Sequence, residues 1–127
     1  MAKILVVDDE PVTNRLLSLM LQRINHSVIT ANNGIEALSY LDKTHIDLMI
    51  TDINMPDING LELLSFIRKS EQHRGVPVLL ISTQSSERDR ERGLKLGADG
   101  YLAKPFTPES LREETARHLT PAASSNG

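Results

Sequence analysis

Three aspartates follow predicted buried strands, and they are the residues of this sequence best suited to chemistry. Asp8 and Asp9 come directly after the apolar run Ile4–Val7. Asp52 follows the apolar run Leu48–Ile50 after one intervening residue, Thr51. A short apolar run that stops at turn-forming residues is typical of a strand buried on both faces. Because the carboxyl ends of parallel strands meet at one edge of a sheet, we expect the three carboxylates to lie together.

Clustered carboxylates repel one another, so a shared site needs positive charge to offset the repulsion. A hard divalent cation supplies that charge, and Mg²⁺ characteristically binds one or two carboxylates, waters and a phosphate oxygen. A simpler interpretation makes Asp52 a turn residue and the pair Asp8-Asp9 a helix cap before Pro11. One aspartate is enough for a cap, so the second one favours the metal interpretation.

Two further strand ends bring a hydroxyl and an ammonium group to the same edge of the predicted sheet. Thr83 follows the run Val78–Ile81, and Lys104 follows Tyr101–Ala103. Such groups are suited to bind the outer oxygens of a phosphoryl group opposite a metal ion. No glycine-rich phosphate loop follows the first strand, which disfavours a nucleotide site. The available nucleophile is therefore the carboxylate of Asp52, which can form an acyl phosphate.

Five apolar runs alternate with five helix-like segments. The expected strands are Ile4–Val7, Val28–Ile29, Leu48–Ile50, Val78–Ile81 and Tyr101–Ala103. Strict alternation of strand and helix predicts an α/β fold with a parallel sheet covered on both faces. The first, third and fourth runs are the most apolar and belong in the middle. This predicts a flavodoxin-like, doubly wound five-stranded parallel sheet of order 2-1-3-4-5 with five helices.

The helices are predicted from capping residues and from the helical spacing of apolar residues. Their expected starts are Pro11, a cap at Asn32 or Asn33, about Leu61, Ser86, and Thr107 followed by Pro108, and the fourth is expected to stop at Gly97. The first helix has helical spacing at Leu16, Leu17, Met20, Leu21 and Ile24. The residues expected to anchor the other helices are Ile35, Leu38, Leu41, Leu61, Leu64, Ile67, Leu94, Leu96, Leu111, Ala116 and Leu119.

The composition limits the classes of protein to consider. The chain has 127 residues, 39% of them hydrophobic, and a net charge of -3 with scattered basic residues. We predict one domain over 1–120, a disordered tail or linker over 121–127, and no nucleic-acid-binding surface. The absence of cysteine excludes disulfides, and the four dispersed histidines lack the spacing of zinc ligands. The first apolar run is too short for a signal peptide or membrane span, which predicts a cytoplasmic location.

The ordered set of motifs resembles the response-regulator receiver domains of two-component signalling, from Lys3 to Leu119. The motifs are Asp8-Asp9, Asp52, Met55-Pro56 with Gly60, Ser82-Thr83, the stretch 97–101 and Lys104-Pro105-Phe106. The resemblance implies that Asp52 is the phosphoacceptor, taking a phosphoryl group from a phosphohistidine on a sensor histidine kinase or phosphotransfer protein. It implies no independent substrate turnover.

The resemblance also implies roles around Asp52. Asp9 and Asp52 would bind Mg²⁺, or Mn²⁺ in its place, directly, whereas Asn54 would bind through its backbone carbonyl and Asp8 through a water. Lys104 and Thr83 would hold the phosphoryl oxygens.

Two more features follow from the resemblance, a cis bond between Lys104 and Pro105 and a switch. Proline tolerates the cis isomer far better than other residues do. Tyr101 would be a rotating aromatic that swings inward when Thr83 moves toward the phosphoryl group. The alternative is a tyrosine ring buried in the core.

The resemblance implies two contact surfaces. The surface formed by the fourth helix, the fifth strand and the fifth helix would bind an output partner or a second copy, giving a monomer or a weak phosphorylation-dependent dimer. The charged stretch 87–92 fits a switch with few apolar anchors, or a merely solvated face. Thr13, Asn14 and Leu17 of the first helix would be candidate kinase contacts.

Two other classes of protein fit the sequence less well. A small aspartate-nucleophile phosphohydrolase usually carries a second aspartate two residues after the nucleophile, but Asn54 stands there. A flavodoxin-like carrier of FMN needs aromatic residues to sandwich the flavin, and aromatics make up only 3% of this chain.

Overall fold

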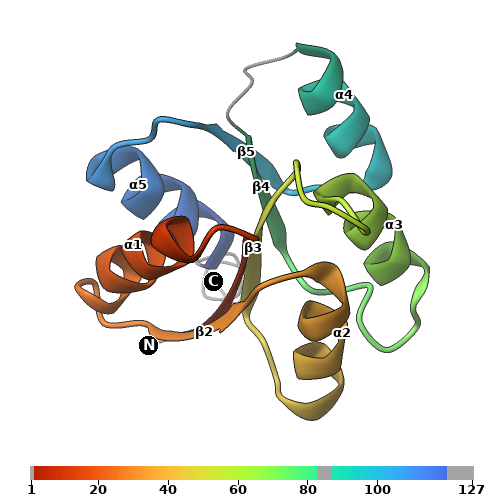
Figure 1. The fold of residues 1–127 in the computed structure, drawn as a ribbon, viewed down its shortest axis with the longest axis horizontal. Helices are drawn as coiled ribbons and strands as arrows, with labels where there is room; N and C mark the ends of the chain where they lie inside the picture. The colour runs from red at the N-terminus through yellow and green to blue at the C-terminus, as the bar shows by residue number, and fades with distance from the viewer. Residues whose placement is uncertain (1, 83–86, 120–127) are drawn as a thin grey trace, which may run out of the picture.

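The computed structural model describes residues 2–82 and 87–119, which form a three-layer α/β domain (Figure 1). Its strands are β1 (Lys3–Val7), β2 (Ser27–Ala31), β3 (Leu48–Asp52), β4 (Val78–Ser82) and β5 (Gly100–Ala103). They pair in parallel in the order β2-β1-β3-β4-β5. The predicted fold class and strand order are confirmed.

Helices cover both faces of the sheet. They are α1 (Pro11–Gln22), α2 (Gly34–Lys43), α3 (Gly60–Lys69), α4 (Glu87–Leu96) and α5 (Pro108–Leu119). Figure 1 shows α1 and α5 on one face and α2, α3 and α4 on the other. Among the described residues, no helix is long and apolar enough to cross a membrane.

The three central strands are buried on both faces because their residues point alternately to the two helix layers. Leu5 and Val7 of β1 belong to the core under α2 and α3. Ile4 and Val6 belong to the core under α1 and α5. Such continuous burial favours long apolar runs, which explains why the most apolar predicted strands lie in the middle.

Side-chain caps start three of the helices, and the sequence predicted those at Asn33 and Thr107 but not the one at Asn59. The Asn33 side chain accepts a hydrogen bond from the backbone of Glu36 at the start of α2. Asn59 and Glu62 form a reciprocal capping box at the start of α3. Thr107 accepts a hydrogen bond from the Ser110 backbone beside α5. The predicted cap at Ser86 lies outside the described residues.

The anchors of the outer helices differ from the prediction in α1, α2 and α5. Leu16 and Ile35 are exposed. Ala37 and Leu41 are the buried residues that face the core from α2. In α5, Leu111 is buried as predicted, but Thr115 takes the inward position and Ala116 is exposed. Apolar spacing alone does not show where the centre of a helix's buried face lies.

The anchor of α4 is a glycine. The predicted anchors Leu94 and Leu96 are both exposed. Gly93 is buried instead, and a Cβ atom built there would lie 2.4 Å from Leu80 Cδ1. The backbone of α4 therefore packs directly on a β4 side chain, a close approach that hydrophobic spacing does not reveal.

Arg68 holds the far end of α4. Its guanidinium donates to the carbonyl oxygens of Gly97, Arg74 and Val76, and it pairs with Asp99 Oδ2 at 2.9 Å. A planar guanidinium can satisfy several acceptors at once in this way. Since few apolar side chains anchor α4, this network fixes the helix at its carboxyl end.

Candidate functional site

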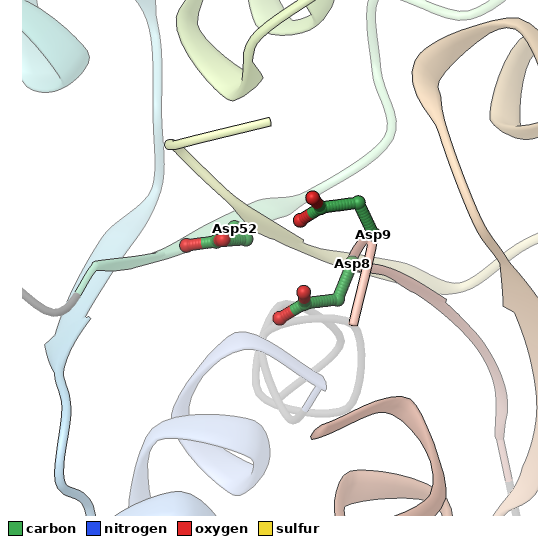
Figure 2. A group of neighbouring side chains, drawn as sticks. All are labelled: Asp8, Asp9 and Asp52. Atoms are coloured by element: carbon green, nitrogen blue, oxygen red, sulfur yellow. The ribbon is translucent and has the colours of Figure 1, made fainter. Parts of the chain in front are cut away.

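The three aspartates come together at the carboxyl edge of the sheet, between β1 and β3. Val7 pairs with Thr51 across these strands, so the residues that follow them are neighbours. One ligand oxygen from each of Asp8, Asp9 and Asp52 lies within 4.8 Å of the others. Figure 2 shows the three carboxylates from these two strand ends gathered in one place. The strand order reverses at this point, as expected for a ligand crevice of a doubly wound sheet.

The three carboxylates have different surroundings. Asp8 is 1% exposed and Asp52 is 7% exposed, whereas Asp9 is exposed to solvent. Asp8 Oδ1 accepts a hydrogen bond from the Glu10 backbone at 2.9 Å. The N-cap of α1 is Glu10, which makes no side-chain cap, and Pro11 begins the helix. The helix-cap interpretation of the aspartate pair is therefore wrong.

Lys104 supplies the positive charge at the site. Its Nζ lies 3.2 Å from Asp8 Oδ2 and 3.7 Å from Asp52 Oδ1, and its side chain is 13% exposed. The backbone N–H of Lys104 donates to the Ser82 carbonyl at 2.7 Å, which holds the end of β5 against β4. The Lys104-Pro105 bond is cis, as the resemblance predicted.

Asp52 is electrostatically unusual. Burial raises the pKa of its carboxyl to about 6, the Lys104 ammonium lowers that pKa, and the Asp8 carboxylate raises it. Asp52 Oδ1 is buried and accepts no hydrogen bond from the described residues. An oxygen-rich cluster with one buried oxygen lacking a donor is the chemistry that a hard divalent cation satisfies. The residues present therefore fit a Mg²⁺ ion.

The remaining predicted site residues lie around this centre. Asn54 is exposed, and its Nδ2 donates to Ser82 Oγ at 3.5 Å, a weak contact. Ser82 is fully buried at the end of β4, although sequence reasoning gave it no role of its own. Thr83 lies outside the described residues. Tyr101 is half-buried and packs against the core under α2 and α3, so the switch and core interpretations both remain open.

Gly60 allows the loop after Asp52 to fold back on the end of β3. Its N–H donates to the Ile53 carbonyl at 2.9 Å. A Cβ atom built at Gly60 would lie 2.3 Å from the Asp52 carbonyl oxygen and 2.8 Å from Ile53 Cα. Backbone atoms cannot move aside as a side-chain end can, so this position requires glycine.

We therefore expect Gly60→Ala to lower the free energy of unfolding by about 2 kcal/mol, the usual cost of overpacking. Urea denaturation followed by circular dichroism measures it. Gly75→Ala is the matched control, because a Cβ atom there meets nothing within 4 Å. Equal stability of the two variants would contradict the proposed steric role of Gly60.

Two of the three predicted kinase contacts on α1 are wrong. Asn14 is 4% exposed and Leu17 is 2% exposed, so neither can meet a partner. The apolar residues that α1 does expose are Val12, Leu16 and Leu19. Their spacing of four and three residues places them on one outer face of the helix. A kinase contact on this helix stays a prediction, and burial distinguishes the outer face of the helix from its inner one.

Comparison with known proteins settles the family. A family model described as the response regulator receiver domain matches residues 4–116. The chain belongs to this family. It is 37% identical over 114 residues to a chemotaxis protein CheY homolog of Campylobacter jejuni, with 88% of each chain covered.

Two further relatives support the receiver assignment. The transcriptional regulatory protein CpxR of Escherichia coli K12 is 42% identical over 111 residues, which cover 87% of this chain but 46% of that protein. The solved structure of chemotaxis protein CheY4 of Vibrio cholerae matches with a TM-score of 0.89 and 38% identity, covering 94% and 99% of the two chains. This receiver domain is thus similar both to single-domain chemotaxis proteins and to the receiver part of a longer regulator.

Proposed function

We propose that this receiver domain is a Mg²⁺-dependent phosphoacceptor whose nucleophile is Asp52. The observation that carries the proposal is the convergence of Asp52 with Asp8, Asp9 and the Lys104 ammonium at one strand edge. A carboxylate oxygen of Asp52 attacks phosphorus, and the P–N bond of the donor phosphohistidine breaks. The imidazole leaves with the bonding electron pair and takes a proton from solvent.

The roles proposed for the acidic residues fit their surroundings. Asp9 and Asp52 would bind the metal directly, and Asn54 would add its backbone carbonyl. Asp8 would act through a water, since its two oxygens already contact the Glu10 backbone and Lys104. The ion, Mg²⁺ or Mn²⁺, supplies positive charge that offsets the charge developing on the transferred phosphoryl oxygens.

The roles proposed for Lys104 and Thr83 are to hold phosphoryl oxygens. Lys104 stands within ion-pair distance of Asp52 Oδ1, close to where an attached phosphoryl group would lie. When the phosphoryl group arrives, Lys104 exchanges part of its pairing with Asp8 for pairing with the new oxygens. Thr83 and Tyr101 would couple that change to the surface formed by α4, β5 and α5.

The partners proposed are a sensor histidine kinase or phosphotransfer protein and a separate output protein. The phosphodonor would contact the exposed apolar face of Val12, Leu16 and Leu19, because this face belongs to α1, the helix that follows Asp9. The output protein would bind the surface of α4, β5 and α5. We further propose a receiver over 1–120, a cytoplasmic location, and a monomer or weak phosphorylation-dependent dimer. The predicted tail over 121–127 lies outside the described residues.

The proposal is tested by incubating the protein with acetyl phosphate. In Mg²⁺ the mass should rise by one phosphoryl group, about 80 Da, and a chelator should prevent the rise. A stoichiometric adduct with no sustained turnover of phosphate monoesters supports the phosphoacceptor. Monoester hydrolysis that is faster than self-phosphorylation would instead support an aspartate-nucleophile phosphohydrolase. Absence of any adduct in Mg²⁺ would contradict the proposal.

A further inference from the structure

Asn14 is a buried polar side chain that joins α1 to the strand ends beneath the acidic cluster. It is 4% exposed. Its Nδ2 donates to the Asp8 carbonyl at 2.7 Å and to the Ala31 carbonyl at 3.1 Å. The Asp8 N–H donates to the same Ala31 carbonyl at 3.1 Å. One carboxamide therefore connects α1 to the ends of both β1 and β2.

The orientation of this carboxamide follows from its neighbours. Two carbonyl oxygens face Nδ2, and turning the amide over would place Oδ1 against both of them. In the observed orientation Asn14 Oδ1 is buried and accepts no hydrogen bond from the described residues. Burying an unpaired amide oxygen is unfavourable, so packing alone does not account for an asparagine here. The two hydrogen bonds that its Nδ2 donates account for the asparagine.

These hydrogen bonds act where the chain leaves β1 to form the acidic cluster. The Asp8 carbonyl belongs to the peptide group that leads into Asp9, so holding it sets the direction of the Asp9 backbone. The Asp8 side chain is held in turn by the Glu10 backbone and by Lys104. We propose that Asn14 is a positioning residue for the divalent-cation site, holding the Asp8-Asp9 backbone so that both carboxylates face Asp52. The inference rests on the proposed function of the cluster as a Mg²⁺ site.

Leu17 provides a matched control on the same helix. It is 2% exposed and packs into the core under α1 and α5. Leu17→Ala opens a cavity in that core and loosens α1, but it leaves the Asn14 hydrogen bonds in place. A comparison of the two positions therefore separates general loosening of the helix from loss of the carbonyl contact.

The experiment is a Mg²⁺ titration of the metal-free protein followed by backbone amide NMR, which measures affinity without any phosphorylation. Asn14→Leu keeps the approximate shape and removes both donors. We expect it to raise the dissociation constant for Mg²⁺ about tenfold, as loss of a group that orients a metal ligand typically does. Leu17→Ala should leave the constant unchanged. Wild-type affinity in Asn14→Leu, or equal weakening in Leu17→Ala, would overturn the inference.

A measurement on the unaltered protein covers the case in which Asn14→Leu does not fold. Saturating Mg²⁺ should slow solvent exchange of the Asn14 carboxamide protons, because a bound ion rigidifies the backbone they hold. The carboxamide of Gln22, exposed at the other end of α1, should not respond. If Mg²⁺ binds but exchange at Asn14 does not change, the inference about Asn14 would be overturned and the proposed function would stand. Wild-type protein that binds no Mg²⁺ would overturn the proposed function as well.

Discussion

Asp52→Asn is expected to abolish the mass gain with acetyl phosphate and Mg²⁺. The amide keeps the size of the side chain but cannot attack phosphorus to form an acyl phosphate. Asp8 is also buried beside Lys104, but its two oxygens are engaged by the Glu10 backbone and the Lys104 ammonium. Asp52 Oδ1, in contrast, accepts no hydrogen bond from the described residues. Intact-protein mass spectrometry measures the result, and the adduct on wild-type protein should be lost on mild alkaline treatment.

Asp57→Asn is the control for this experiment. Asp57 is an exposed carboxylate in the loop between β3 and α3. Its positive φ of 66° is one that asparagine also tolerates. We expect this variant to gain the phosphoryl group as wild-type protein does. An adduct that persists in Asp52→Asn, or disappears in Asp57→Asn, would place the phosphoacceptor elsewhere.

Asp52→Asn is also expected to stabilise the metal-free protein at pH 7.5. Burial raises the pKa of Asp52 from 3.8 to about 6, so the folded protein holds this proton more tightly than the unfolded chain. Between these pKa values the folded state binds more protons, and wild-type stability therefore falls as the pH rises through this window. Above pH 6 the full pKa shift lowers the free energy of unfolding of the wild-type protein by an amount on the order of 2–3 kcal/mol. The neutral amide of Asp52→Asn has no such loss.

The measurement is urea unfolding of both proteins in a chelator from pH 4 to 7.5. The difference in the free energy of unfolding should be close to zero at pH 4, grow through pH 5 to 6 and level off above that. Because all other carboxyl groups are common to both proteins, the difference isolates Asp52. Glu71→Gln, at an exposed position, should show no such pH-dependent gain. A difference that does not vary with pH would contradict the raised pKa.

Added Mg²⁺ should reverse the order of stability at pH 7.5. A ligand that binds only the folded state stabilises it in proportion to its occupancy. Wild-type protein offers the Asp52 carboxylate to the ion, and Asp52→Asn does not. The buried Asp52 carboxylate thus destabilises the metal-free protein, and the same carboxylate is the proposed metal ligand and nucleophile.

The architecture and the edge of the sheet that carries the acidic cluster could be predicted from the residue pattern alone. Continuous apolar runs predicted the central strands because burial on both faces favours apolar side chains at successive positions. The carboxylates at the ends of two such runs then had to meet, since parallel neighbours share one edge. The cap at Asn33 was predictable because capping is local and depends on residues within one helical turn.

Features that depend on contacts between distant segments could not be predicted from the sequence and required the folded structure. The inward position of Asn14, the close packing of Gly93 on Leu80 and the exposed face of α1 each depend on how a helix is rotated against the sheet. Helical spacing predicts that a helix has a buried face. It does not fix the rotation of the helix against the sheet, and a rotation by one residue changes which side chain is buried. The pKa of Asp52 likewise depends on the folded structure, because burial and the Asp8 carboxylate raise it, the Lys104 ammonium lowers it, and both neighbours lie far away in the chain. Local patterns therefore predicted the elements and their ends, whereas helix rotation and electrostatics required the folded structure.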